Sequence, residues 1–329
     1  MAKRESSIAT PLAHLVGPGK LKVINEQLAF STQKGEVIRL NPESLTTVMC
    51  YGEVGITDRA FQLLFKHNIE VAWLTPAGNR CKGRLVRSDP SSTVLRMAQH
   101  RTLAQPEPQL QIARAIVQGK IDSQLEALRH YQRHGHKSTA AIRTQLQDAH
   151  KSCDTADSLD QLRGLEGSSS AAWFRFFGEL LCEPWVFEQR ARRPPPDPVN
   201  ALLSLGYTWL LTKAIARCEA KGFEIQLGAL HAYRAGRPSL ACDVIEPLRV
   251  PAVDRWVIPL LNRATIKLED FEKENEGFRL QPSIFPTILQ SWEQHWLDRK
   301  LEAMLLAWLD QIEAFCRQCA NLPESDGSN

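Results

Sequence analysis

The spacing of apolar residues changes once along this chain, in the turn-forming segment at residues 87–92. Before that segment, apolar residues occur in short runs broken by turn residues, as in a set of small β-strands. From Thr93 onward they recur every three or four residues, which is the period of an amphipathic helix. This change predicts an α+β protein with a small β-rich domain at residues 1–88 and a larger all-α domain at residues 89–320. The polar residues 321–329 are expected to be a disordered tail.

The first domain is expected to pack and self-associate rather than to catalyse. Residues 20–24 and 27–31 read as two strands joined by a tight turn at Asn25-Glu26. Residues 57–67 read as a short helix with Thr57 at its N-cap. No set of catalytic side chains lies in this region. Sheet edges and outward apolar residues favour a dimerisation role.

Composition excludes several classes of protein. No run of 18 apolar residues is present, so no membrane span is expected. The first residues lack the apolar core of a secretory signal, and the eight cysteines are scattered, which favours reduced thiols and a cytoplasmic location. Cys316 and Cys319 form a CxxC without a second pair, so a zinc site is not expected there. The net charge of +3 is too small to indicate nucleic acid by itself.

Residues 228–249 contain His231, Asp243 and Glu246 within sixteen positions. Ser239 is a plausible N-cap for a helix over 240–248, on which Asp243 and Glu246 share one face. Two carboxylates and an imidazole suit Mg²⁺ or Mn²⁺. A solvated acidic face beside a structural histidine is the alternative reading of the same residues.

A second unusual segment surrounds Glu166. The apolar period indicates one helix here, yet Gly164, Gly167 and the serines 168–170 interrupt it. Each glycine costs a helix about 1 kcal/mol against alanine, so a close neighbour at Glu166 is expected. Glu166 borders an apolar stripe and needs a partner, either a metal or a buried arginine. Close helix–helix packing, with Glu166 held by an arginine, is the alternative.

Basic residues cluster next to a proline-rich loop that precedes a central helix. Asp197 is expected to cap that helix, with Pro198 in its first turn and Gly222 after its end. Asn200 is expected to hold a neighbouring loop by hydrogen bonds. Five arginines are candidates for binding a polyanion such as a phosphate backbone: Arg190, Arg192, Arg193, Arg237 and Arg249. Ordinary surface solubility is an equally good account of this charge.

Three segments together resemble one known family. They are Leu165-Glu166-Gly167 with the small residues and aromatic pair that follow, the stretch 193–207, and the stretch 228–249. In order and spacing they resemble the CRISPR-associated integrase, the larger subunit of the CRISPR adaptation machinery. The resemblance is specific over about residues 160–262. Trp173-Phe174 stands where Tyr-Phe is more usual in the family.

The resemblance implies a homodimer formed through the β domain and a helical domain with a divalent metal site for Mg²⁺ or Mn²⁺. It implies binding of prespacer DNA duplexes with a small ferredoxin-like subunit, joining of their 3′-hydroxyl ends to the CRISPR repeat by transesterification, and metal-dependent nuclease activity. Carried over to this sequence, the catalytic metal ligands are Glu166, His231 and the acidic pair Asp243 and Glu246. Whether Asp243 or Glu246 binds directly stays open.

Two other functions fit the same residues. One is a metal-dependent nuclease that cuts branched or repair DNA without integration. The other is a non-catalytic DNA-binding scaffold in which arginines hold Glu166 and Glu246.

Overall fold

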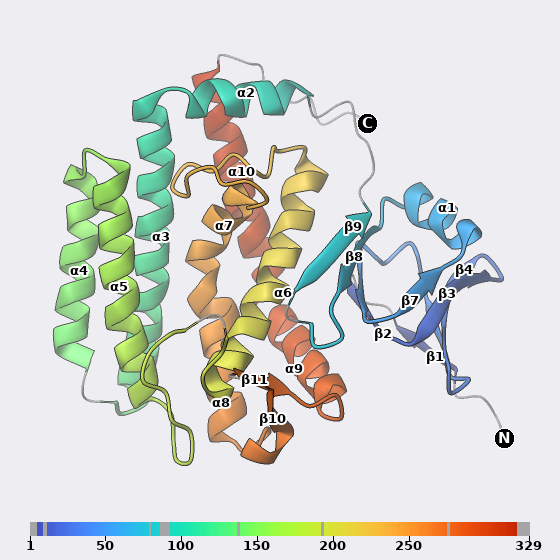
Figure 1. Ribbon diagram of the computed structural model, residues 1–329. Helices are drawn as coiled ribbons and strands as arrows, with labels where there is room; N and C mark the ends of the chain where they lie inside the picture. The colour runs from blue at the N-terminus through green and yellow to red at the C-terminus, as the bar shows by residue number, and fades with distance from the viewer. Residues whose placement is uncertain are drawn as a thin grey trace. The chain divides into compact units, whose positions relative to one another are not determined.

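The computed structural model describes residues 5–8, 12–78, 80–85, 93–136, 139–191, 194–274 and 277–320, and Figure 1 shows their arrangement. The chain divides into two compact units, residues 1–89 and residues 90–329. The roles expected for these units, dimerisation and catalysis, stay predictions. The expected tail at 321–329 lies outside the described residues.

The first unit contains two sheets and one helix. Its elements are β1 (Glu5–Ile8), β2 (Leu12–Val16), β3 (Gly19–Ile24), β4 (Gln27–Thr32), β5 (Val37–Leu40), β6 (Thr47–Tyr51), β7 (Val54–Ile56), α1 (Asp58–Lys66), β8 (Glu70–Leu74) and β9 (Cys81–Leu85). One sheet has the order β1-β5-β4-β3-β7, and the other has the order β2-β6-β8-β9.

Local sequence explains the turns of this unit. β3 and β4 pair antiparallel with Ile24 opposite Gln27, and the turn residues Asn25 and Glu26 have φ of 50° and 60°. This left-handed backbone matches the twist of a two-residue hairpin, as expected for this sequence. The Thr57 side chain accepts a hydrogen bond from the Ala60 N–H at 3.3 Å, which confirms the predicted cap of α1.

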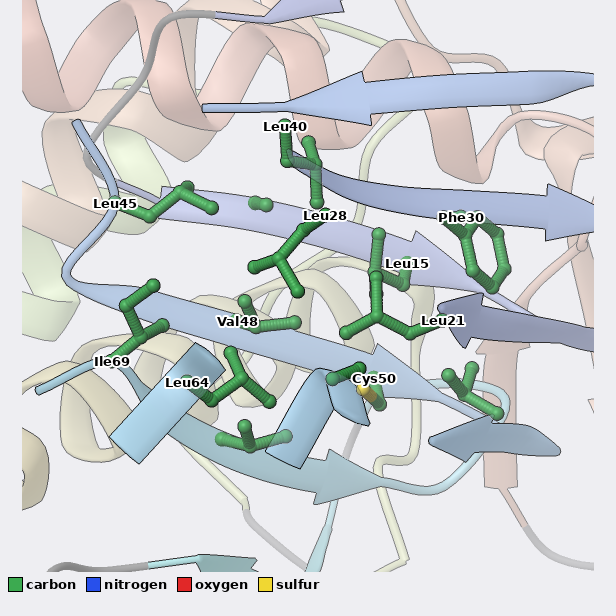
Figure 2. Packing of buried hydrophobic residues seen from close by; sticks show 14 residues of the cluster. Leu15, Leu21, Leu28, Phe30, Leu40, Leu45, Val48, Cys50, Leu64 and Ile69 are labelled. Atoms are coloured by element: carbon green, nitrogen blue, oxygen red, sulfur yellow. The ribbon is translucent and has the colours of Figure 1, made fainter. Parts of the chain in front are cut away.

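The core of the first unit lies between the two sheets and α1. Figure 2 shows its side chains, which come from strands of both sheets and from the helix. Leu21, Leu28 and Leu40 come from one sheet, and Val48 and Cys50 come from the other. All five are fully buried. Alternate residues of these short strands therefore supply one apolar core, as the strand pattern predicts.

The second unit is mainly helical. Its helices are α2 (Thr93–Leu103), α3 (Pro106–Arg133), α4 (Thr139–Thr155), α5 (Leu159–Glu179), α6 (Pro198–Lys221), α7 (Ser239–Ile245), α8 (Arg255–Asn262), α9 (Phe285–Asp298) and α10 (Leu301–Cys319). Between α7 and α8 lie a 3₁₀ turn, Glu246–Leu248, and a π-helical turn, Val250–Asp254. A further 3₁₀ turn, Leu268–Asp270, precedes a small hairpin of β10 (Phe271–Glu274) and β11 (Gly277–Leu280). The predicted α+β class is confirmed, and the hairpin is an addition to the all-α domain.

Helix α6 lies at the centre of the second unit. The Asp197 side chain accepts from the Asn200 N–H at 2.7 Å at its start, and Gly222 ends it with φ of 90°, both as the sequence predicts. Trp209 of α6 packs with Trp256 and Trp292 at ring-centroid distances of 5.9 and 5.6 Å. Helices α3, α4 and α5 pack together beside this core (Figure 1).

Within the described part of the chain, we find no helix both long and apolar enough to span a membrane.

Candidate metal centre

Three elements of the second unit bring their polar side chains to one point. Lys120 lies on α3, Glu166 on α5 and Glu246 at the start of the 3₁₀ turn. The Lys120 ammonium forms ion pairs with Glu166 Oε1 and, at 2.7 Å, with Glu246 Oε2. The Lys120 and Glu246 side chains are only 6% and 3% exposed, so this cluster lies largely away from solvent.

Asp243 holds the loop that carries His231. Its Oδ2 accepts the N–H groups of Ala229 and Leu230 at 2.6 and 3.1 Å, and its Oδ1 accepts that of His231 at 3.0 Å. A Cβ on Gly228 would lie 2.6 Å from Asp243 Oδ2, so only glycine lets the loop come this close. Steric space therefore explains why a glycine stands at position 228.

Asp243 also orients the imidazole of His231. Its Oδ1 lies 2.5 Å from His231 Nδ1. Because this oxygen is an acceptor, Nδ1 carries a proton, so in the neutral form of the imidazole the acceptor lone pair lies at Nε2. His231 Nε2 points towards Glu246 and lies 4.0 Å from its Oε1. Asp243 and Glu246 therefore both face His231.

The charges around Glu246 keep it ionised. Burial by itself raises the pKa of this carboxyl, but the nearby charges of Arg249 and Lys120 outweigh it and lower the pKa to about 2. Arg249 Nε lies 2.9 Å from Glu246 Oε2. Glu246 is thus a buried anion with two basic neighbours, and its Oε1 faces His231.

The donor types suit a divalent cation, since carboxylate oxygens and a neutral imidazole are ligands for Mg²⁺ and Mn²⁺. Among the described residues, however, no three His, Cys, Asp or Glu side chains are gathered closely enough to hold a metal together. Glu166 and Glu246 instead share the Lys120 ammonium, and Ser170 Oγ donates to Glu166 Oε1 at 3.0 Å. The ligand types fit, and an internal cation lies between the two carboxylates.

A cavity of about 590 Å³ adjoins this cluster, and Lys120 and Glu166 belong to its lining. Arg190 and Arg249, which also line it, stack on the Tyr207 ring at 5.3 and 4.8 Å from its centroid. The lining also includes Glu188 and Asp254, so Arg190 and Arg249 form a local basic part of the wall, to which a phosphate group would be attracted.

Residues 13–294 match the sequence profile of the family described as CRISPR associated protein Cas1. This chain belongs to the Cas1 family. A curated relative from Thermus thermophilus, CRISPR-associated endonuclease Cas1 3, is 34% identical over 260 residues, covering 79% of this chain and 75% of the relative. The family named by the resemblance is confirmed.

Solved structures agree with this fold. A Cas1 protein from Thermotoga maritima superposes with a TM-score of 0.83 at 21% identity, covering 97% of this chain and all of that one. A chain of a solved Cas6-RT-Cas1–Cas2 complex gives a TM-score of 0.74 at 25% identity, covering 93% of this chain and 36% of that chain.

The Cas1 fold places the predicted site residues in different ways. Glu166, His231 and Glu246 converge on the cluster. Asp243 differs from the predicted ligand role, because both its oxygens accept hydrogen bonds from residues 229–231. Ser239 is not the N-cap: α7 begins at Ser239, after Pro238, without a side-chain cap.

The predicted arginines of this Cas1 chain are largely engaged with protein groups. Arg190 donates to Asn200 Oδ1 at 2.9 Å and to Ser204 Oγ at 3.0 Å. Arg237 donates to the Ala232 carbonyl and so braces the loop after His231. Arg192 and Arg193 lie outside the described residues. Asn200 also bonds the backbone of residues 189 and 191, which holds the loop before α6.

Close packing accounts for Ser169 of the small-residue patch beside Glu166, which is fully buried, but not for its two glycines. A Cβ on Gly164 or Gly167 would meet nothing within 4 Å, so no neighbouring helix explains them. Glu166 pairs with a lysine rather than with an arginine. Gly164, Gly167 and Ser168 are exposed and leave an open face on α5.

Sequence reasoning missed Lys120 and Gln124. Both lie on the apolar stripe of α3, between Val117 and Leu125, and both are buried. A lysine and a glutamine four residues apart on a buried stripe are a signal, since such groups need partners. The partners come from α5 and the 3₁₀ turn, which no local pattern reveals.

Proposed function

We propose that this chain is a metal-dependent DNA endonuclease and integrase of CRISPR adaptation. Its substrates would be a short prespacer duplex and the CRISPR repeat, joined through the prespacer 3′-hydroxyl by transesterification. The observation that carries the proposal is the convergence of Glu166, His231 and Glu246 at the edge of a cavity lined by basic residues. Membership of the Cas1 family supports it.

We assign the metal to Glu166, to Glu246 and to His231 Nε2, and Asp243 to the support of His231. The carboxylate and imidazole donors suit Mn²⁺ and tolerate Mg²⁺. When bound, such an ion polarises the phosphoryl group and stabilises the leaving oxygen. Asp243 keeps the proton on His231 Nδ1, and Arg249 and Arg190 attract the phosphate from the cavity wall.

The proposed assembly is a homodimer that binds DNA with a small ferredoxin-like subunit in the cytoplasm. One structural relative is solved as part of a Cas6-RT-Cas1–Cas2 complex, which supports a Cas protein partner.

The test is an integration assay with a plasmid that carries a CRISPR repeat, a short duplex and the partner subunit. We expect Glu166→Ala, His231→Ala and Glu246→Ala each to reduce the amount of joined product by roughly 100-fold or more, with either Mn²⁺ or Mg²⁺. Circular dichroism and thermal melting check that the variants stay folded. Glu313→Ala is the matched control. Glu313 lies on α10 and pairs with Lys221 of α6 at 3.0 Å, so this variant should keep full activity.

The outcomes separate the candidate functions. Full integration by the Glu166 or Glu246 variant would overturn the site. Cleavage of DNA by the wild type without any joined product would favour the nuclease that acts on branched or repair DNA. DNA binding without either activity, and without Mn²⁺ binding in calorimetry, would favour the scaffold.

A further inference from the structure

Lys120 forms the central contact of the carboxylate cluster. Its ammonium is the one group that bonds both Glu166 and Glu246 among the described residues. The two carboxylates come from α5 and from the 3₁₀ turn, and each accepts a hydrogen bond from the Lys120 ammonium. An ammonium in this position neutralises charge that a buried acidic pair would otherwise leave uncompensated.

A divalent ion bound by the same two carboxylates would lie within a few ångströms of this ammonium. Like charges at such a distance in a poorly solvated site repel strongly, so both cations cannot keep full contact with the pair. Metal binding at Glu166 and Glu246 therefore requires the Lys120 side chain to move.

Gln124 offers a position to which that side chain can move. It lies one helical turn after Lys120 on α3, and both residues line the same cavity. Gln124 is 1% exposed, and its Oε1 has no hydrogen-bond partner among the described residues. A buried acceptor without a donor costs stability, and an ammonium arriving from one turn away would satisfy it.

We propose that Lys120 is a displaceable internal cation, which holds Glu166 and Glu246 in the metal-free protein and turns to Gln124 Oε1 when a divalent ion binds. Lys120 is a positioning residue in this scheme, because it acts through the ligands. The inference rests on the proposed function, which assigns the metal to Glu166 and Glu246.

The test is titration of the full-length protein with Mn²⁺ by calorimetry, without DNA. Lys120→Met removes the competing charge, so we expect the Mn²⁺ dissociation constant to fall by about tenfold. Lys120→Arg keeps the charge and should bind no more tightly than the wild type. Lys213→Met is the matched control, a lysine with a 7% exposed side chain that pairs with Glu293 at 3.5 Å, and its Mn²⁺ affinity should equal that of the wild type.

Gln124→Met should act in the opposite direction. It leaves the displaced ammonium without an acceptor, so Mn²⁺ binding should weaken several-fold. Thermal melting gives a second measurement that does not depend on activity. Metal-free Lys120→Met should melt below the wild type, and saturating Mn²⁺ should raise its melting temperature by more than it raises that of the wild type.

A merely structural lysine would give a different result. Unchanged or weaker Mn²⁺ binding by Lys120→Met, with wild-type binding intact, would overturn the displaceable cation and leave the metal site standing. Absence of Mn²⁺ binding in the wild type and in Lys120→Met alike would overturn the metal site itself. Loss of binding in Glu166→Ala identifies the carboxylates as the ligands measured.

Discussion

Asp254 links the stability of the helical unit to pH through one buried carboxyl. Its Oδ2 accepts from Trp173 Nε1 at 2.7 Å and its Oδ1 accepts from the Tyr207 hydroxyl at 2.5 Å. Burial raises the pKa of Asp254 to about 6, although these hydrogen bonds and the charges of Arg249 and Arg190 oppose the rise. The folded protein therefore holds a proton that the unfolded chain has released at the same pH.

The sign of the pH dependence follows from this difference in bound protons. The stabilisation is fully present below the unfolded pKa of about 4 and is lost as pH rises through about 6. We expect the wild type to lose about 3 kcal/mol of unfolding free energy over that range, relative to Asp254→Asn, which cannot titrate. Denaturant unfolding between pH 4 and about 7 measures this difference in unfolding free energy.

The 91% exposed Asp160 supplies a control: the unfolding free energy of Asp160→Asn should change with pH in parallel with that of the wild type. Parallel curves for Asp254→Asn would refute the expectation.

At the scale of the elements, local patterns predicted most boundaries, because caps and turns act over a few residues. Thr57, Asp197 and Gly222 begin or end their helices as expected. The helix expected over 240–248 changes instead to 3₁₀ and π turns after Ile245. Pro247 and Pro251 each remove a helical donor there, and tertiary packing selects which irregular turn results.

The candidate site could be predicted only in part, because local patterns carry information over a few residues. Glu166, His231 and Glu246 each lie next to a run of apolar residues, and such polar side chains are expected to need a partner. The roles of Asp243 and Lys120 depend on distances between elements far apart in the chain, and spacing along the sequence carries no such distances. The sequence therefore leaves open whether Asp243 or Glu246 is the direct ligand, whereas in the structure the Asp243 oxygens bind the 229–231 loop.

Two glycines of the site are expected to respond oppositely to alanine. Gly167 lies in helix α5 with open space around a Cβ, so Gly167→Ala should raise the unfolding free energy by about 1 kcal/mol. At Gly228 a Cβ would lie 2.8 Å from the Ser239 carbonyl carbon, so Gly228→Ala should lower the unfolding free energy by about 1–3 kcal/mol. Denaturant unfolding of both variants decides the matter, and shifts of the same sign would contradict the packing described for α5 and the loop.

At the scale of the whole molecule, the division into two units places the expected dimer contacts and the candidate centre on different parts of the chain. We expect the full chain, and residues 1–89 expressed alone, each to have twice its monomer mass by light scattering after size-exclusion chromatography. The reason is that sheet edges and outward apolar side chains, such as the 40% exposed Val16 of β2, favour pairing with a second copy. A monomeric 1–89 fragment beside a dimeric full chain would move the dimer contacts to the helical unit.

The dispersal of the cluster over α3, α5 and the turn at Glu246 has a consequence for biosynthesis. A ribosome that has released only the first 200 residues has produced Lys120 and Glu166, but neither His231 nor the carboxylate that completes the pair. The proposed chemistry is therefore withheld from a nascent or truncated chain.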